Sequence, residues 1–228
     1  MSADARKSIG CVAVIGGTGQ LGRALATRWA GAGIDIRIGS RDAAKAQQVA
    51  RELTASTGMS VAGGSMLEAA EAAGIIVVAV PFAAQAETLA EIRPATTGKI
   101  VLDTTVPLMP PKVMRVQLPA EGSAAVRAQQ LLGSETTVVS AFHNVSAAKL
   151  ARAGAVDCDV LVCGDSPAAR RVAIALVEAA GLRGLHAGAL VNSAASEALT
   201  SVLILINKTY SVEGAGVRIT GHLTAPED

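Results

Sequence analysis

Apolar and polar positions alternate along this chain in blocks that predict strands and helices in turn. An apolar run at residues 9–15 ends in two glycines, and a helical pattern follows over residues 20–32. The run at residues 74–80 carries no charged or polar side chain and ends at a proline, which is typical of a strand buried on both faces. The chain therefore begins with a strand, a crossover helix and further buried strands.

The later blocks keep the same order. Further strands are predicted at residues 34–38, 99–102, 136–141 and 159–163, and further helices at residues 42–57 and 167–180. Strands that alternate with helices indicate an α/β fold with a doubly wound, mostly parallel sheet of the Rossmann type.

The pattern changes near the C-terminus. Residues 192–207 read as one apolar helix, and a glycine-containing tail follows. We therefore divide the chain into a Rossmann domain, residues 1–188, and a small helical C-terminal part, residues 189–228. A proline-rich segment, residues 107–117, is predicted to be a loop.

Composition narrows the class of protein. Half of the residues are hydrophobic but only 2% are aromatic, so Ala, Val, Leu and Ile must build the core. A net charge of +1 gives no basic face for nucleic acid. No uninterrupted apolar run approaches the roughly 18 residues that cross a bilayer, and the polar start lacks the apolar segment of a signal peptide. We expect a cytoplasmic protein that binds neither membrane nor nucleic acid.

The metal-ligating residue types are few and scattered. The three cysteines, Cys11, Cys158 and Cys163, form no CxxC pair and are expected to be reduced and buried. The three histidines show no metal-ligand spacing, so no metal site is predicted.

A glycine motif follows the first predicted strand and opens the first helix. Gly17, Gly19 and Gly22 fit G-x-G-x-x-G. In that motif the first glycine allows a tight turn, the second lets backbone approach a pyrophosphate, and the third lets the helix pack against the strand. The amides at the helix start then favour the phosphate charge. The motif predicts dinucleotide binding.

The same segment also fits the G-x-x-G-x-x-G pattern of extended short-chain dehydrogenases, through Gly16, Gly19 and Gly22. Those enzymes need a Tyr-x-x-x-Lys pair. The only tyrosine, Tyr210, is followed four residues later by Gly214, which disfavours that family.

The end of the second predicted strand indicates which dinucleotide binds. An NAD site normally has Asp or Glu there, to bind the ribose 2′-hydroxyl. This chain has Ser40 and Arg41, with Lys45 one helical turn later. A hydroxyl and two cations suit a 2′-phosphate, which arginine can bind through two hydrogen bonds. We therefore predict NADP(H) rather than NAD(H).

Taken together, these residues resemble the NADPH-dependent reductases of the deazaflavin coenzyme F420. The resemblance begins with residues 16–22 and with Ser40, Arg41 and Lys45, and it extends over nearly the whole chain. Further matches are Val80-Pro81-Phe82, Val106-Pro107, Ser140-Ala141-Phe142-His143, Cys163-Gly164-Asp165, Ala187-Gly188, Asn192-Ser193 and residues 214–219.

The resemblance implies an NADP-dependent oxidoreductase that transfers a hydride between NADP(H) and coenzyme F420. It implies that the nucleotide is held by Gly17, Thr18, Gly19, Gln20, Leu21, Ser40, Arg41 and Lys45, and that its path is lined by Val80, Phe82, Ala86, Leu108, Ala147 and Ala215. His143 would sit at the deazaflavin end as the candidate catalytic residue, donating a hydrogen bond to the acceptor ring. Departures from the family pattern at Phe82, residues 83–84 and residues 103–105 lie near the acceptor.

Two alternative functions remain at this point. One is an NADPH-dependent reductase of a flavin or of a small imine or carbonyl compound, and the other is a non-catalytic NADP-binding module. Reduction of a carbonyl usually needs a positioned acid, and the sequence shows no clear acid–base pair, which favours the deazaflavin.

A homodimer is also expected. Residues 198–206 are apolar on nearly every side of the predicted helix, so the helix needs cover from the core or from a second copy.

Overall fold

The computed structural model describes residues 9–224, and the polar start considered above, residues 1–8, lies outside this range with residues 225–228. The first half contains β1 (Cys11–Ile15), α2 (Gln20–Gly31), β2 (Asp35–Gly39), α3 (Ala43–Thr57), β3 (Val61–Gly64), α4 (Met66–Glu71), β4 (Ile75–Val78) and α5 (Phe82–Ile92). The second half contains η1 (Arg93–Ala95), β5 (Ile100–Asp103), α6 (Ala124–Leu132), β6 (Thr137–Ser140), α7 (Ala147–Leu150), β7 (Asp159–Gly164), α8 (Pro167–Ala179), β8 (Arg183–His186), η2 (Leu190–Asn192) and α9 (Ser193–Tyr210).

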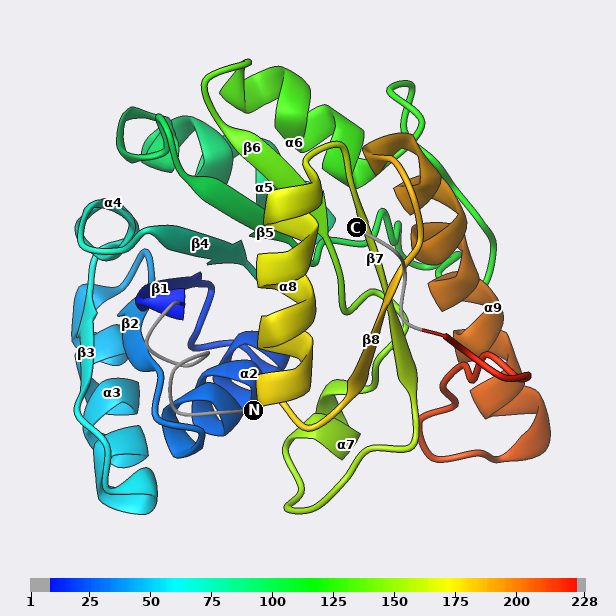
Figure 1. The fold of residues 1–228 in the computed structure, drawn as a ribbon, viewed down its shortest axis with the longest axis horizontal. Helices are drawn as coiled ribbons and strands as arrows, with labels where there is room; N and C mark the ends of the chain where they lie inside the picture. The colour runs from blue at the N-terminus through cyan, green and yellow to red at the C-terminus, as the bar shows by residue number, and fades with distance from the viewer. Residues whose placement is uncertain (1–8, 225–228) are drawn as a thin grey trace.

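Within the described residues, eight strands form one sheet in the order β3-β2-β1-β4-β5-β6-β7-β8 (Figure 1). The first six strands in this order, from β3 through β1 to β6, are parallel. Strand β7 is antiparallel to β6, and β8 is parallel to β7. The predicted doubly wound, mostly parallel sheet is thereby confirmed. Sequence patterns did not predict β3 or β8, which are short and contain glycine, nor α4 to α7.

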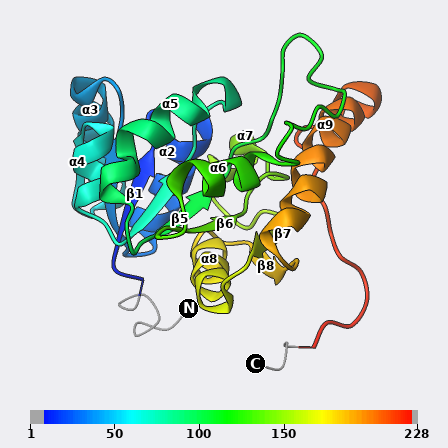
Figure 2. The same ribbon diagram turned by 90° about the horizontal axis from the view of Figure 1, so that it is seen from above.

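Helices cover both faces of the sheet, and each face has its own core. Figure 2 shows α5 and α6 on one side of the sheet and α8 on the other. The larger core lies under α2, α3 and α8 and includes Trp29, whose indole N–H donates to the Leu176 carbonyl at 2.7 Å. The smaller core lies under α4, α5 and α6 and is built from Ala, Val, Leu and Ile with one methionine, as the composition requires.

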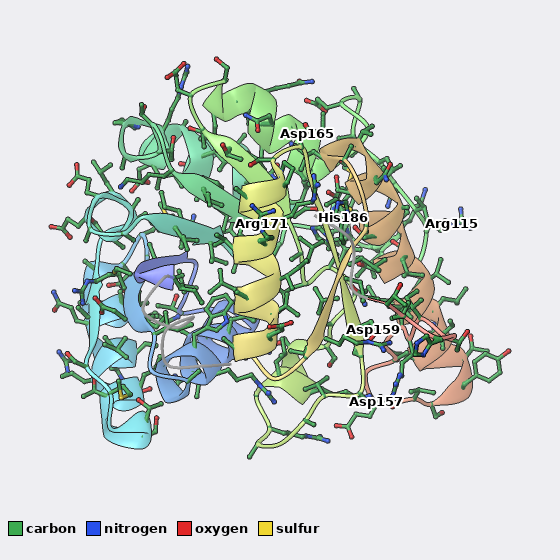
Figure 3. The ribbon with its side chains drawn as sticks, in the orientation of Figure 1. Arg115, Asp157, Asp159, Asp165, Arg171 and His186 are labelled. Carbon is green, nitrogen blue, oxygen red and sulfur yellow. The ribbon has the colours of Figure 1, made fainter. Side chains whose placement is uncertain are left out.

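The C-terminal part is tied back to the sheet at both ends. Near its start, the Leu190 N–H donates to Asp165 at the end of β7, at 2.9 Å. Near its end, the Ile219 N–H donates to the Asp159 carboxylate at 2.7 Å, which also pairs with Arg183. Figure 3 shows Asp165 and Asp159 at opposite ends of β7. The division of the chain at residues 188/189 stays a prediction.

One helix differs from the expectation that no apolar segment of the chain is long enough to cross a bilayer. Residues 190–210 form a continuous helix that is long and apolar enough to cross a membrane by length and composition, and a third of its most apolar window is buried. The sequence count missed it because Glu197 and several serines interrupt the apolar run. In the structure these polar side chains face the domain: Ser193, Ser196, Glu197 and Ser201 are all buried.

Candidate functional site

The turn between β1 and α2 depends on glycines that no larger residue could replace without movement. Gly16 has a φ of +81°, and a Cβ there would lie 2.5 Å from the Ala79 carbonyl oxygen. A Cβ on Gly22 would lie 2.6 Å from the Gly16 carbonyl oxygen, so Gly22 allows α2 to pack against the turn. The left-handed turn residue is therefore Gly16, whereas the sequence motif pointed to Gly17.

Gly17 has a different role from the one predicted. Its φ is not in the left-handed region, but a Cβ would approach the Val14 carbonyl oxygen at 2.9 Å and the Ile38 side chain at 3.0 Å. Within the described chain, α2 begins after Gly19 with no side-chain cap. The N–H groups of its first turn, which include those of Gln20 and Leu21, are therefore available to an anion.

A cleft of about 210 Å³ opens at the carboxyl ends of β1, β2 and β4. Parallel α/β sheets bind dinucleotides at this edge. Five residues predicted from sequence line it: Thr18, Gly19, Ser40, Arg41 and Val80. The other lining residues are Gly16, Met66, Ala79, Pro81, Ala84 and Thr88.

The positively charged side chain of Arg41 lies at the polar end of the cleft. Arg41 is exposed and has no ion-pair partner within residues 9–224. The carboxylate of Asp42 caps α3 by accepting the Lys45 N–H at 3.0 Å, and the Asp42 N–H donates to the Ser40 hydroxyl at 3.2 Å. The acidic side chain nearest the predicted phosphate site is thus engaged in capping. Lys45 is exposed one turn further along α3 and does not line the cleft.

The structure does not bring the remaining predicted residues into this cleft. Gln20 and Ala147 line a second cavity of about 410 Å³ between α2 and α7. Phe82 packs under the Arg127 guanidinium at 5.0 Å, and the Ala215 N–H donates to Asn207 at 2.6 Å. Several of the residues predicted to contact the nucleotide are partly exposed. They are Leu21, Val80, Phe82, Ala86, Leu108, Ala147 and Ala215.

Backbone hydrogen bonds continue beyond the strands and align the next residues. The Ala79 N–H donates to the Ile15 carbonyl, Thr104 to Val78, and Ala141 to Asp103, at 2.9, 3.1 and 3.2 Å. The donors Ala79, Thr104 and Ala141 therefore fall in one row at the carboxyl edge of the sheet, which we call the edge row. His143 follows two residues after Ala141.

Buried polar groups gather beside the edge row. The Asp103 carboxylate is fully buried and accepts the Thr105 N–H at 2.6 Å and the Gln85 side-chain N–H at 2.5 Å. Glu197 of α9 accepts the N–H groups of Ala124 and Ala125, at 2.7 and 3.1 Å. Burial raises the pKa of Asp103 to about 6 and that of Glu197 to about 8. Sequence reasoning missed both carboxylates, although an aspartate directly after a buried strand was a usable signal.

His143 lies among these groups and is only 4% exposed. Its Nδ1 is 3.2 Å from the Ser196 hydroxyl, and its Nε2 has no hydrogen-bond partner. The Thr200 hydroxyl donates to the His143 carbonyl at 2.8 Å, which fixes the backbone to α9. Burial lowers the pKa of His143 to about 4, so the ring is neutral at pH 7.

The buried Asp103 should make stability depend on pH. Because its pKa is raised in the folded state, the folded protein holds a proton that the unfolded chain releases near pH 4. The free energy of unfolding should therefore fall as the pH rises from 4 through 6, by on the order of 3 kcal/mol for a shift of about two units. Urea unfolding at a series of pH values measures this slope. Asp103→Asn should make the slope between pH 4 and 6 shallower and leave the part that the raised pKa of Glu197 contributes. Parallel curves for the two proteins would contradict the prediction.

Comparison with known proteins connects the fold to a family. Residues 11–107 match the family model described as NADP oxidoreductase, coenzyme F420-dependent. The chain is 41% identical, over 92% of its length and 94% of the relative, to the F420-dependent NADP reductase of Methanothermobacter thermautotrophicus. It is 36% identical, over 92% of its length and 97% of the relative, to the protein of the same name from Methanocaldococcus jannaschii.

A solved structure supports the fold independently. The crystal structure of a putative F420-dependent NADP reductase from Arthrobacter sp. FB24 superposes with a TM-score of 0.77 and 24% sequence identity. The match covers 92% of this chain and 99% of that one.

Proposed function

Because the chain belongs to the family of coenzyme F420-dependent NADP oxidoreductases, we propose that it transfers a hydride between NADP(H) and coenzyme F420. The observation that carries the proposal is the 41% identity over nearly the whole length of a relative with that name. The structure adds a glycine turn, an uncapped helix start and a free arginine around one cleft, which together fit a phosphorylated dinucleotide.

Different residues at the cleft would bind different parts of the dinucleotide. Thr18 and the start of α2 would hold the pyrophosphate, because their N–H groups can donate to its oxygens. Gly19 would contribute close approach rather than a donor, since its N–H already donates to the Gly16 carbonyl at 2.9 Å. Ser40, Arg41 and Lys45 would hold the 2′-phosphate. Ala79 and Val80, which both line the cleft, would then lie toward the nicotinamide ring.

The chemistry needs positioning more than acid–base catalysis. In the reducing direction, a hydride leaves C4 of the nicotinamide and bonds to C5 of the deazaflavin, and a proton from solvent completes the reduction. The protein must hold the two rings roughly 3–3.5 Å apart in a site that excludes water. The edge row, whose backbone is fixed by hydrogen bonds to the neighbouring strands, would provide a rigid wall for such a site.

The acceptor can be tested directly. NADPH oxidation should be followed under anaerobic conditions by stopped-flow absorbance, with coenzyme F420, FMN, FAD and a small cyclic imine supplied separately. We expect rapid bleaching of the deazaflavin band and little or no turnover with the others. Oxidation with only a flavin or the imine would replace the acceptor but leave the NADP site intact. Tight NADPH binding with no oxidation by any acceptor would favour a non-catalytic module.

We also propose that the protein is a homodimer formed through α9. This helix directs Ser196 and Glu197 toward the domain and leaves Val202 and Leu205 43% and 46% exposed. Part of the apolar surface of α9 thus faces outward although Leu203 is buried, and a helix covered only by its own domain would expose less apolar surface. A second copy would cover it in a closed twofold pair.

Light scattering coupled to size exclusion should give twice the chain mass of 22.9 kDa. Leu205→Glu should give the single-chain mass, because a buried charge opposes association. Met59→Glu is the matched control, since Met59 is 39% exposed and follows α3 by two residues. Helix α3 lies on the opposite side of the molecule from α9 (Figure 1). A single-chain mass for the unmodified protein at micromolar concentration would contradict the proposal.

A further inference from the structure

One wall of the cleft carries no charged side chain. It is built by Met66 at the start of α4 and by Pro81, Ala84 and Thr88, which follow one another from the N-cap of α5 along that helix. We call these four residues the apolar wall. The glycine turn, the serine and arginine after β2 and the residues after β4 line the rest of the cleft. The cleft thus joins a part that suits phosphate to a part that suits a flat apolar group.

Thr88 is the polar member of the apolar wall, and its side chain is only 3% exposed. Its hydroxyl has no hydrogen-bond partner within residues 9–224. A threonine inside a helix often bonds to the carbonyl one turn back, as Thr27 of α2 does with Arg23 at 2.8 Å. The Thr88 hydroxyl makes no such bond, so it is free to bind something else.

The free hydroxyl of Thr88 opens into the cleft. The unpartnered hydroxyl oxygens of Thr105 and Ser140 are sealed in the interior, whereas that of Thr88 is not closed off in this way. Because Thr88 is otherwise buried and lines the cleft, the cleft is where its oxygen can be reached. A deeply placed hydroxyl without a partner is uncommon in proteins, and water or a ligand normally satisfies it.

One part of a dinucleotide phosphate matches the apolar wall. The proposed function already assigns both phosphate groups to the glycine turn and to the residues after β2, which leaves the adenine base. Its flat faces are apolar enough to lie against Met66 and Ala84. Its 6-amino group is the only hydrogen-bond donor on the base, and a hydroxyl oxygen can accept from it.

We propose that Thr88 is a specificity-determining residue of the nucleotide site, whose hydroxyl oxygen accepts a hydrogen bond from the 6-amino group of adenine. Met66 and Ala84 cover the faces of the base. The inference rests on the NADP(H) half of the proposed function and is independent of the hydride acceptor. Sequence patterns did not indicate Thr88, because it lies within a helix and belongs to no motif.

Calorimetry with adenosine 2′,5′-bisphosphate, the base-bearing half of NADP, tests the contact without turnover. Thr88→Val keeps the branched shape and removes the hydroxyl, so it should weaken binding of this fragment and of NADPH by roughly 3- to 10-fold. Thr88→Ser keeps the hydroxyl and should retain most of the affinity. Thr27→Val is the matched control, because the Thr27 hydroxyl is already bonded and lies outside the cleft. Equal affinities for Thr88→Val and the unmodified protein would overturn the inference.

An altered base identifies the atom that the hydroxyl contacts. The analogue of adenosine 2′,5′-bisphosphate with hydrogen in place of the 6-amino group is smaller than the parent and lacks only the proposed donor. The unmodified protein should bind this analogue more weakly, and Thr88→Val should cause no further loss. An undiminished effect of Thr88→Val would place the hydroxyl on the ribose or on a ring nitrogen and would also overturn the inference.

Stability separates a binding role from a structural one. Because the Thr88 hydroxyl has no partner in the described chain, Thr88→Val should not lower the urea midpoint of the ligand-free protein. A lowered midpoint together with weaker binding would assign Thr88 a structural role and contradict the inference. If the unmodified protein binds neither NADPH nor adenosine 2′,5′-bisphosphate, the proposed function fails instead.

Discussion

Replacing Arg41 by alanine should weaken NADPH binding by roughly 10- to 150-fold and leave NADH binding nearly unchanged, because a charged hydrogen bond contributes about 1.5–3 kcal/mol. Arg41 lines the cleft and has no ion-pair partner in the described chain, so its charge is available to a 2′-phosphate. The neighbouring Asp42 is engaged in capping α3 and leaves the site cationic. NADH lacks the 2′-phosphate and loses nothing.

Calorimetry measures the affinity of each variant for NADPH and for NADH, and the ratio of the two affinities gives the discrimination. Lys45→Ala should have a smaller effect, because Lys45 lies outside the cleft. Arg51→Ala on the same helix is the matched control for loss of an exposed arginine, and it should change neither affinity. An equal loss of NADPH and NADH binding in Arg41→Ala would remove the basis for NADP specificity.

Adding one methyl group at Gly22 should impair both folding and nucleotide binding. The new Cβ would lie 2.6 Å from the Gly16 carbonyl oxygen and 2.9 Å from the Gly17 Cα, and backbone atoms cannot move aside as a flexible side chain can. Such overpacking costs about 1–3 kcal/mol. Any relief would shift α2 away from the turn, and the N–H groups that face the pyrophosphate would move with it. We therefore expect the affinity for NADPH to fall as well, by roughly 10-fold or more.

The same helix contains its own control. Gly31, the last residue of α2, is exposed, and a Cβ there would meet nothing within 4 Å. Gly31→Ala should therefore keep full NADPH affinity and raise stability by up to about 1 kcal/mol, because alanine favours the helix. Urea unfolding and calorimetry compare the two variants. If both behave alike, close packing of α2 on the turn does not determine the nucleotide site.

Sequence patterns were sufficient to predict the features that lie within one or two neighbouring segments. The glycine motif at residues 16–22 and the Ser40–Arg41 pair are local, and both come next to strands that hydrophobic runs made visible. The structure places Thr18, Gly19, Ser40 and Arg41 around one cleft because adjacent parallel strands end at the same edge. Local chemistry and sheet topology together were sufficient for this half of the site.

Some local detail still escaped the pattern. The motif has glycine at both residue 16 and residue 17, and only the folded turn shows that Gly16 takes the left-handed conformation. Strands β3 and β8 are four residues long and contain glycine, so they lack a hydrophobic signal. Pairing with a neighbouring strand stabilises them, and the residues of β3 and β8 alone do not indicate that pairing.

The other half of the site depends on contacts that form only in the folded chain. His143 meets Ser196 across 53 positions of sequence, and Glu197 meets the start of α6 across 73. The apolar pattern of α9 could not show which side faces the domain, because nearly every side looks suitable for burial. The structure buries Glu197 because its carboxylate accepts the N–H groups of Ala124 and Ala125 at the start of α6, which would otherwise be unpaired in the interior. Two buried serines make similar contacts, Ser196 with the His143 ring and Ser201 with the Arg115 carbonyl. Hydrogen bonds to residues remote in sequence thus determine which side of α9 packs against the domain. The apolar periodicity of the helix does not indicate that side.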